Sequence, residues 1–100
     1  MAKEKGSSMN TNNISQVEDY LIALLDVARN KKVEIYNDQI HKIFFFLENE
    51  KRVNLGLNFM PDYYGPSSPD LDRILVNLIE KEVVKINFKK LNYMSFEHLV

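Results

Sequence analysis

Histidine and serine are the side chains through which this chain could do chemistry, and they are few. His41 and His98 are its two histidines and it has no cysteine, so the usual donor set of a zinc site is missing. Ser67 and Ser68 have no histidine near them in sequence, whereas a serine nucleophile needs an adjacent base. The glycines are isolated and form no phosphate-binding motif. We therefore expect no enzyme activity, no cofactor and no metal, and we expect His41 to be a half-buried packing residue.

Basic side chains could contact the phosphates of a nucleic acid. The candidates are Arg73, Asn77 and Lys81 on the exposed side of a helix, and Lys85, Lys89 and Lys90 on a following hairpin. Asp72 and Glu80 would share the helix face, and their negative charge would repel phosphate. Lysines on the edge of a hairpin also prevent edge-to-edge aggregation without any ligand. Both interpretations of the lysines stay open.

Aromatic side chains could instead bind a partner protein. Successive helical residues point about 100° apart, so Phe44, Phe45 and Phe46 cannot share one face of a helix. If Phe44 points into the core, Phe45 and Phe46 flank it, where the connection at residues 51–65 could fold back and cover them or where they could face a partner. Tyr63 and Tyr64 precede a Gly-Pro turn, and they could pack that turn onto the core or stack on bases. Since exposed apolar patches are typical of interfaces, we predict a protein interface at Phe45, Phe46, Tyr63 and Tyr64.

Length and composition predict one domain. The chain has 100 residues, of which 45% are hydrophobic, enough for a core without disulfides. Residues 1–13 lack apolar periodicity and are expected to form a flexible tail before a domain of residues 14–100, and either Met1 or Met9 fits as the native start. The net charge of −1 gives no overall attraction to nucleic acid or membrane. The lack of cysteine and of a long apolar run predicts a cytoplasmic protein that does not bind membranes.

Three amphipathic helices must position these side chains. The first is predicted from Ser15, where Ser15 and Glu18 match a capping box, to about residue 30. The second is predicted from Asn37, as its N-cap, to about residue 50. The third follows Ser68 as N-cap and Pro69 as first residue. Its apolar stripe is made of Leu71, Ile74, Leu75, Leu78 and Ile79.

Extended segments are predicted between and after the helices. Residues 33–36 alternate between apolar and polar side chains, as a short strand does. Residues 51–66 form a connection too long to be structureless, so we expect it to pack on the domain, with an extended stretch at residues 53–59. Residues 84–89 alternate in the same way and predict a hairpin with a return strand at residues 93–98.

The order helix, strand, helix, helix, hairpin is that of a winged helix. We therefore predict an α+β fold that is mainly helical and winged-helix-like, with three main helices and a small antiparallel sheet. In winged helices the third helix enters the major groove of DNA and the hairpin contacts the backbone or the minor groove.

The stretch from Phe59 to Val84 carries a pattern of an aromatic residue, a proline, a Tyr-Gly-Pro-x-Ser box and regularly spaced leucines. The matching residues are Phe59, Pro61, Tyr64, Gly65, Pro66, Ser68, Leu71, Leu75 and Leu78. This pattern resembles that of small prokaryotic proteins, many of them archaeal, and of the Panacea antitoxin domain, over about residues 15–90. Glu82 stands where the pattern has a glycine. The resemblance implies a winged-helix-like or related helical fold and a non-catalytic role in binding, linked in the family to regulation, antitoxin activity and mobile elements.

Taken together, these features predict a small regulatory or accessory protein that acts through protein–protein interaction. We expect a protein partner of unknown identity, no small-molecule substrate, and a homodimer formed through the flank with Phe45 and Phe46 or the turn with Tyr63 and Tyr64. The alternative is a winged-helix DNA-binding regulator that uses the hairpin lysines and Arg73.

Overall fold

The computed structural model describes residues 9–63, 65–90 and 93–99, with the backbone course alone for residues 88–90 and 93. Within these residues the fold is α+β and mainly helical, as predicted. The helices are α1 (Thr11–Asn30), α2 (Asn37–Asn49) and α3 (Pro69–Glu80). Two antiparallel hairpins complete it: β1 (Met60–Asp62) with β2 (Gly65–Ser67), and β3 (Val84–Lys90) with β4 (Tyr93–His98).

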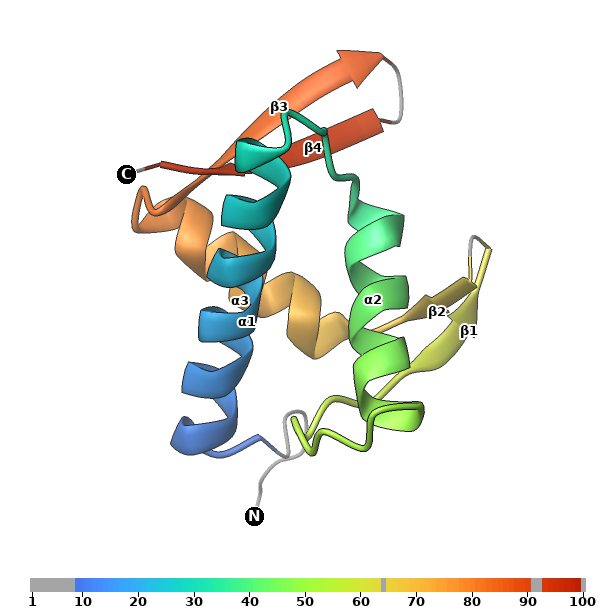
Figure 1. Ribbon diagram of the computed structural model, residues 1–100. Helices are drawn as coiled ribbons and strands as arrows, with labels where there is room; N and C mark the ends of the chain where they lie inside the picture. The colour runs from blue at the N-terminus through green and yellow to red at the C-terminus, as the bar shows by residue number, and fades with distance from the viewer. Residues whose placement is uncertain (1–8, 64, 91–92, 100) are drawn as a thin grey trace.

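The helices enclose one core that the hairpins flank. In Figure 1, α1 and α2 run in opposite directions, and α3 runs from the side of α2 to behind α1. The β3–β4 hairpin lies across one end of the helices, and the β1–β2 hairpin lies against α2. The core is formed by Val17, Leu21, Leu25, Ala28, Ile35, Ile40, Phe44, Leu55, Leu57, Leu71, Ile74, Leu75, Leu78, Val84 and Phe96. Because every helix contributes an apolar stripe to it, burial of these side chains is the main force that holds the helices together.

The first helix begins earlier than predicted. Its N-cap is Asn10, whose side-chain oxygen accepts a hydrogen bond from the backbone N–H of Asn13 at 2.8 Å, so the predicted start at Ser15 is wrong. Asparagine is as good an N-cap as serine, and the upstream residue starts the helix one turn sooner. Residues 11–13, assigned to the tail from sequence, are therefore helical. Residues 1–8 of the predicted tail lie outside the described residues.

The third helix begins where the sequence predicts, and the second begins one residue earlier. The N-cap of α2 is Tyr36 rather than Asn37, and its backbone N–H donates to Gln39 Oε1 at 2.8 Å. The N-cap of α3 is Ser68, whose hydroxyl accepts from the backbone N–H of Leu71 at 3.3 Å. The predicted apolar stripe of α3 is confirmed, since four of its five side chains are buried and the fifth packs against the core.

The predicted strand at residues 33–36 is reduced to a single bridge. Tyr36 pairs with Ser95 of β4, and Phe96 N–H donates to the carbonyl of Ile35 at 3.1 Å. Val33 is 58% exposed and takes no part in the bridge. The alternating pattern correctly indicates that Ile35 is buried, but it is too short to build a ladder.

The connection after α2 packs on the domain, as expected, but not as a strand at residues 53–59. Leu55 and Leu57 are buried, and the Glu48 carboxylate accepts hydrogen bonds from both of their backbone N–H groups, at 3.2 and 2.9 Å. The pairing begins only at Met60, in the β1–β2 hairpin that the sequence interpretation missed. The predicted hairpin of β3 and β4 is confirmed.

Each of the helices ends near a charged residue with positive φ. These residues are Lys32 at 58°, Arg52 at 57° and Glu82 at 62°. After α3, Glu82 N–H donates to the carbonyl of Ile79 and Val83 N–H to that of Leu78, which is a Schellman motif. Glu82 thus has the backbone conformation that glycine adopts most easily, at the position where the family pattern has glycine.

Candidate functional site

An apolar groove lies between α2 and the β1–β2 hairpin. It has a volume of about 380 Å³ and is lined by Phe45, Phe59, Met60, Pro61, Asp62, Gly65 and Pro66. Phe44 is fully buried in the core. Because successive helical residues point about 100° apart, Phe45 then points outward and can line the groove. The chain then returns along α2, and Phe59 meets the Phe45 ring edge to face with centroids 5.3 Å apart.

The hairpin wall of the groove is built from two facing prolines. Pro61 pairs with Pro66, Met60 with Ser67 and Asp62 with Gly65. Proline has a fixed φ and no backbone N–H, so this wall is stiff and presents carbon rather than hydrogen-bond donors. Met60 is 52% exposed. The groove therefore offers a preformed apolar surface, which limits the ordering cost of binding.

The structure places the described members of the predicted interface at different positions. Phe45 on α2 is 38% exposed and lines the groove. Tyr63, at the turn of the β1–β2 hairpin, is 90% exposed. Phe46 is 48% exposed but does not line the groove, and Lys51 Nζ lies 5.8 Å from the centroid of its ring. Tyr64 lies outside the described residues. Met60, which the sequence interpretation missed, is more exposed than Phe45 and belongs to the same surface.

Charged groups stand at the end of the groove near the hairpin turn. Lys42 of α2 is half exposed and pairs with Asp38 one helical turn earlier, with Nζ and Oδ2 3.7 Å apart. A Cβ on Gly65 would lie 3.2 Å from Cε of Lys42, so this lysine rests against the hairpin. Asp62, opposite Gly65 in the pairing, is exposed, and its Oδ1 accepts from the backbone N–H of Tyr63 at 2.7 Å.

His41 holds α2 against the start of α3. Its side chain is not half-buried, as expected, but 2% exposed, and it hydrogen-bonds at both nitrogens. Nδ1 accepts from the backbone N–H of Ser68 at 3.0 Å, and Nε2 lies 2.8 Å from Asp72 Oδ1. Because a backbone N–H can only donate, Nδ1 carries no proton and Nε2–H donates to Asp72. Both nitrogens are occupied, so His41 links α2 to the first turn of α3.

The residues proposed for nucleic acid differ in how far they are available. Arg73 forms an ion pair through one guanidinium nitrogen with Asp70, which is 5% exposed. Lys81 and Lys85 are exposed, but Glu80 is exposed beside them in sequence and Asn77 is partly covered. The side chains of Lys89 and Lys90 fall outside the described part of the chain. Burial of Asp70 was not foreseen, because nothing local to its sequence distinguishes it from an exposed first-turn acid.

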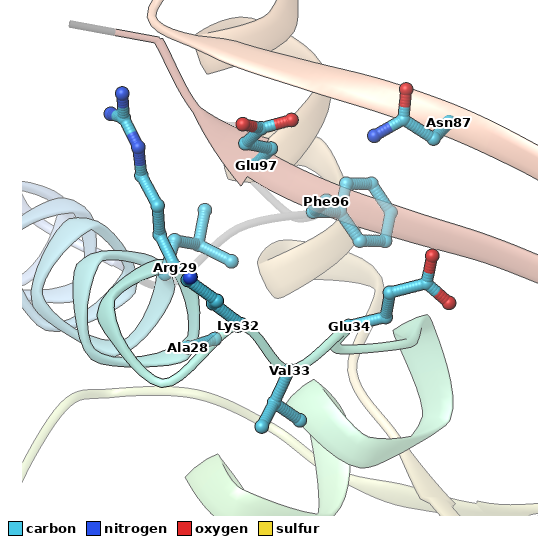
Figure 2. A pocket seen from close by; sticks show the side chains of 9 residues that line it. Ala28, Arg29, Lys32, Val33, Glu34, Asn87, Phe96 and Glu97 are labelled. Atoms are coloured by element: carbon cyan, nitrogen blue, oxygen red, sulfur yellow. The ribbon is translucent and has the colours of Figure 1, made fainter.

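A second cavity, of about 330 Å³, lies between the end of α1 and the β3–β4 hairpin. In Figure 2 the ring of Phe96 lies between the carboxylates of Glu97 and Glu34. Arg29 of α1 and Lys32 of the turn after it line the same cavity. The Arg29 guanidinium donates to the carbonyl of His98 at 3.2 Å. Two acids and two bases line this cavity, so it has no net preference for a charged ligand.

Among the described residues, no three or more histidine, aspartate or glutamate side chains gather as metal ligands would. In the same part of the chain, none of the helices combines the length and the apolar character that crossing a membrane demands. A scan against models of protein families matched none of them, and searches of curated proteins and of solved structures each gave no match.

Proposed function

We propose that this chain is a non-catalytic regulatory or accessory protein of the cytoplasm that binds a partner protein through the apolar groove between α2 and the β1–β2 hairpin. The observation that carries the proposal is the exposure of two large apolar side chains, Phe45 and Met60, beside each other on a preformed surface. Apolar side chains gathered in this way on a small protein mark interaction sites. Gly65 and Pro66 of the Tyr-Gly-Pro-x-Ser box, which the resemblance links to binding, lie in the same hairpin.

The groove is of a size to take one large side chain of a partner. Interfaces gain most of their affinity from a few anchors that fill apolar pockets near their centre. Phe59 packs edge to face on Phe45, and Pro61 and Pro66 stiffen the hairpin wall, so little has to move when an anchor enters. The absence of cysteine supports the cytoplasmic location.

Oxidation of Met60 by dilute hydrogen peroxide tests the proposal. The rate is measured by mass spectrometry in cells that produce the chain and on the purified protein at high dilution. The Val76→Met variant is the matched control, because Val76 on α3 is 51% exposed and Met60 is 52% exposed. Because cells consume part of the peroxide, the two positions are compared with each other. We expect the oxidation rate of Met60, relative to that of the methionine introduced on α3, to be lower in cells than at high dilution. Equal protection at both positions would refute the groove as a binding site.

The second candidate is a DNA-binding regulator with a winged-helix-like arrangement. Two observations favour it. The segment between α1 and α2 joins the β3–β4 hairpin through the Tyr36–Ser95 bridge, and Lys85 on β3 is exposed. The Arg73–Asp70 ion pair and the exposed Glu80 argue against it. Binding to a mixed-sequence duplex that falls steeply with salt concentration would place this candidate first.

A further inference from the structure

We propose that the occupant of the groove is a second copy of this chain, bound about a two-fold axis so that Lys42 of each copy faces Asp62 of the other. This inference rests on the proposed function, because it names the partner for the same surface. Two features of the groove lead to it: the charged side chains at the end near the β1–β2 turn, and the apolar part with Phe45 and Met60 next to them.

A cation and an anion border the same end of the groove. Lys42 rests against Gly65, and Gly65 is the backbone partner of Asp62, so the two charged groups lie on either side of one glycine. The Lys42 side chain is 54% exposed, and Asp62 is exposed. Both can therefore be reached by a partner that fills the apolar part of the groove next to them.

A surface with both signs of charge beside an apolar centre is complementary to itself. In a two-fold interface, if residue i of one copy contacts residue j of the other, then j of the first also contacts i of the second. Lys42 and Asp62 then form two equivalent ion pairs at one end of the interface, and Phe45 and Met60 of both copies meet next to them. A partner whose surface carries only negative charge, such as a nucleic acid or an anionic membrane, would be repelled by Asp62.

Each part of this interface has a different role. Rim ion pairs contribute little because water and salt screen them, so the apolar contact supplies most of the affinity. The charges fix which ends of the two grooves meet, since like charges placed opposite each other disfavour the wrong arrangement. Reversal of one charge should therefore weaken the dimer through repulsion while the fold of each copy stays intact.

Charge reversal and sedimentation test this arrangement. The variants Lys42→Asp and Asp62→Lys are purified separately and compared with the wild-type chain over a range of concentrations. The wild-type chain is expected to dimerise. Each variant alone brings like charges together at both contacts, and its dissociation constant should rise about tenfold to a hundredfold. A mixture of the two variants should regain the wild-type affinity, because one copy then carries two acids and the other two bases.

The control is Lys85→Asp, which makes the same charge change on β3, outside the groove, and should leave dimerisation unchanged. Thermal unfolding of every variant shows that loss of dimer is not loss of fold. A wild-type chain that stays monomeric, single variants that dimerise like the wild type, or a mixture that fails to recover would each overturn the inference. A monomeric purified chain whose Met60 is nevertheless protected in cells would mean that another protein fills the groove, and the proposed function would stand.

Discussion

Phe45 and Phe59 meet edge to face, with ring centroids 5.3 Å apart and ring planes at 79°. The contact joins α2 to the chain that enters the β1–β2 hairpin, and it uses only part of the Phe45 surface. The remaining 38% of that residue stays exposed. One residue thus anchors the wall of the groove and also forms part of the surface that a partner would contact.

Phe45→Ser separates these two roles. We expect it to reduce the free energy of unfolding by about 1–2 kcal/mol, mainly through the lost ring contact. We expect it to weaken association about 30-fold, as loss of an aromatic anchor does. Denaturation and sedimentation equilibrium measure the two effects. Phe44→Ala is the contrast: Phe44 is fully buried, so the change should cost about 3–5 kcal/mol of folding stability. A large loss of stability from Phe45→Ser without weaker association would make Phe45 a core residue.

His41→Ala should destabilise the fold by about 3 kcal/mol, because it leaves the buried N–H of Ser68 without its acceptor and opens a cavity. His41→Asn is the informative companion variant. The asparagine oxygen reaches about as far as Nδ1 and can still accept from Ser68, so we expect roughly half of that loss. Urea denaturation measures both values. Equal losses in the two variants would show that packing, and not the hydrogen bond, makes His41 important.

Gly65→Val should destabilise the protein more than Ser67→Ala. Gly65 has φ of 124°, a conformation that side chains with a Cβ rarely adopt, so we expect a loss of about 1–3 kcal/mol. Ser67 is half-buried in the same short strand, and its change should stay within about 0.5 kcal/mol. Thermal unfolding of both variants measures the difference. Similar midpoints would mean that the turn relaxes to accept the valine.

Glu82→Gly should stabilise the protein by about 0.5–1 kcal/mol. Glu82 has φ of 62° at the end of α3, where glycine carries no penalty for left-handed backbone. Glu80→Gly, two residues earlier in the last turn of α3, should instead destabilise it by about 1 kcal/mol. The midpoints of thermal unfolding should move in opposite directions. A lower midpoint for Glu82→Gly would show that the glutamate side chain makes a contact worth more than the backbone strain.

Local signals in the sequence predicted the parts of the fold that depend on neighbours along the chain. Ser68, Pro69 and the apolar stripe of α3 lie within a few residues of one another, and the helix they predict is present. The spacing of the three phenylalanines correctly assigned Phe44 to the core and its neighbours to the flanks. It could not tell that the chain near Phe59 returns to support Phe45 and leaves Phe46 apart.

The groove was missed in part because its wall contradicts strand propensity. Pro61 and Pro66 each argue against a strand, yet they face each other in a hairpin so short that few ladder hydrogen bonds are lost. The link from His41 to Asp72 spans 31 residues and depends on how two helices pack, which no local pattern encodes. Such contacts follow from the tertiary structure and could not be predicted from one sequence.

Photo-crosslinking from position 60 is the most direct test of the account, because it captures whatever fills the groove. An amino acid with a benzophenone side chain replaces Met60 in cells that produce the chain. After irradiation, the mass of any adduct is measured by mass spectrometry. The account predicts a discrete adduct of twice the chain mass, which disappears when Phe45→Ser is added and is absent when the probe replaces Val76. No adduct from position 60, or the same adducts from both positions, would contradict the claim that the groove is an interaction surface.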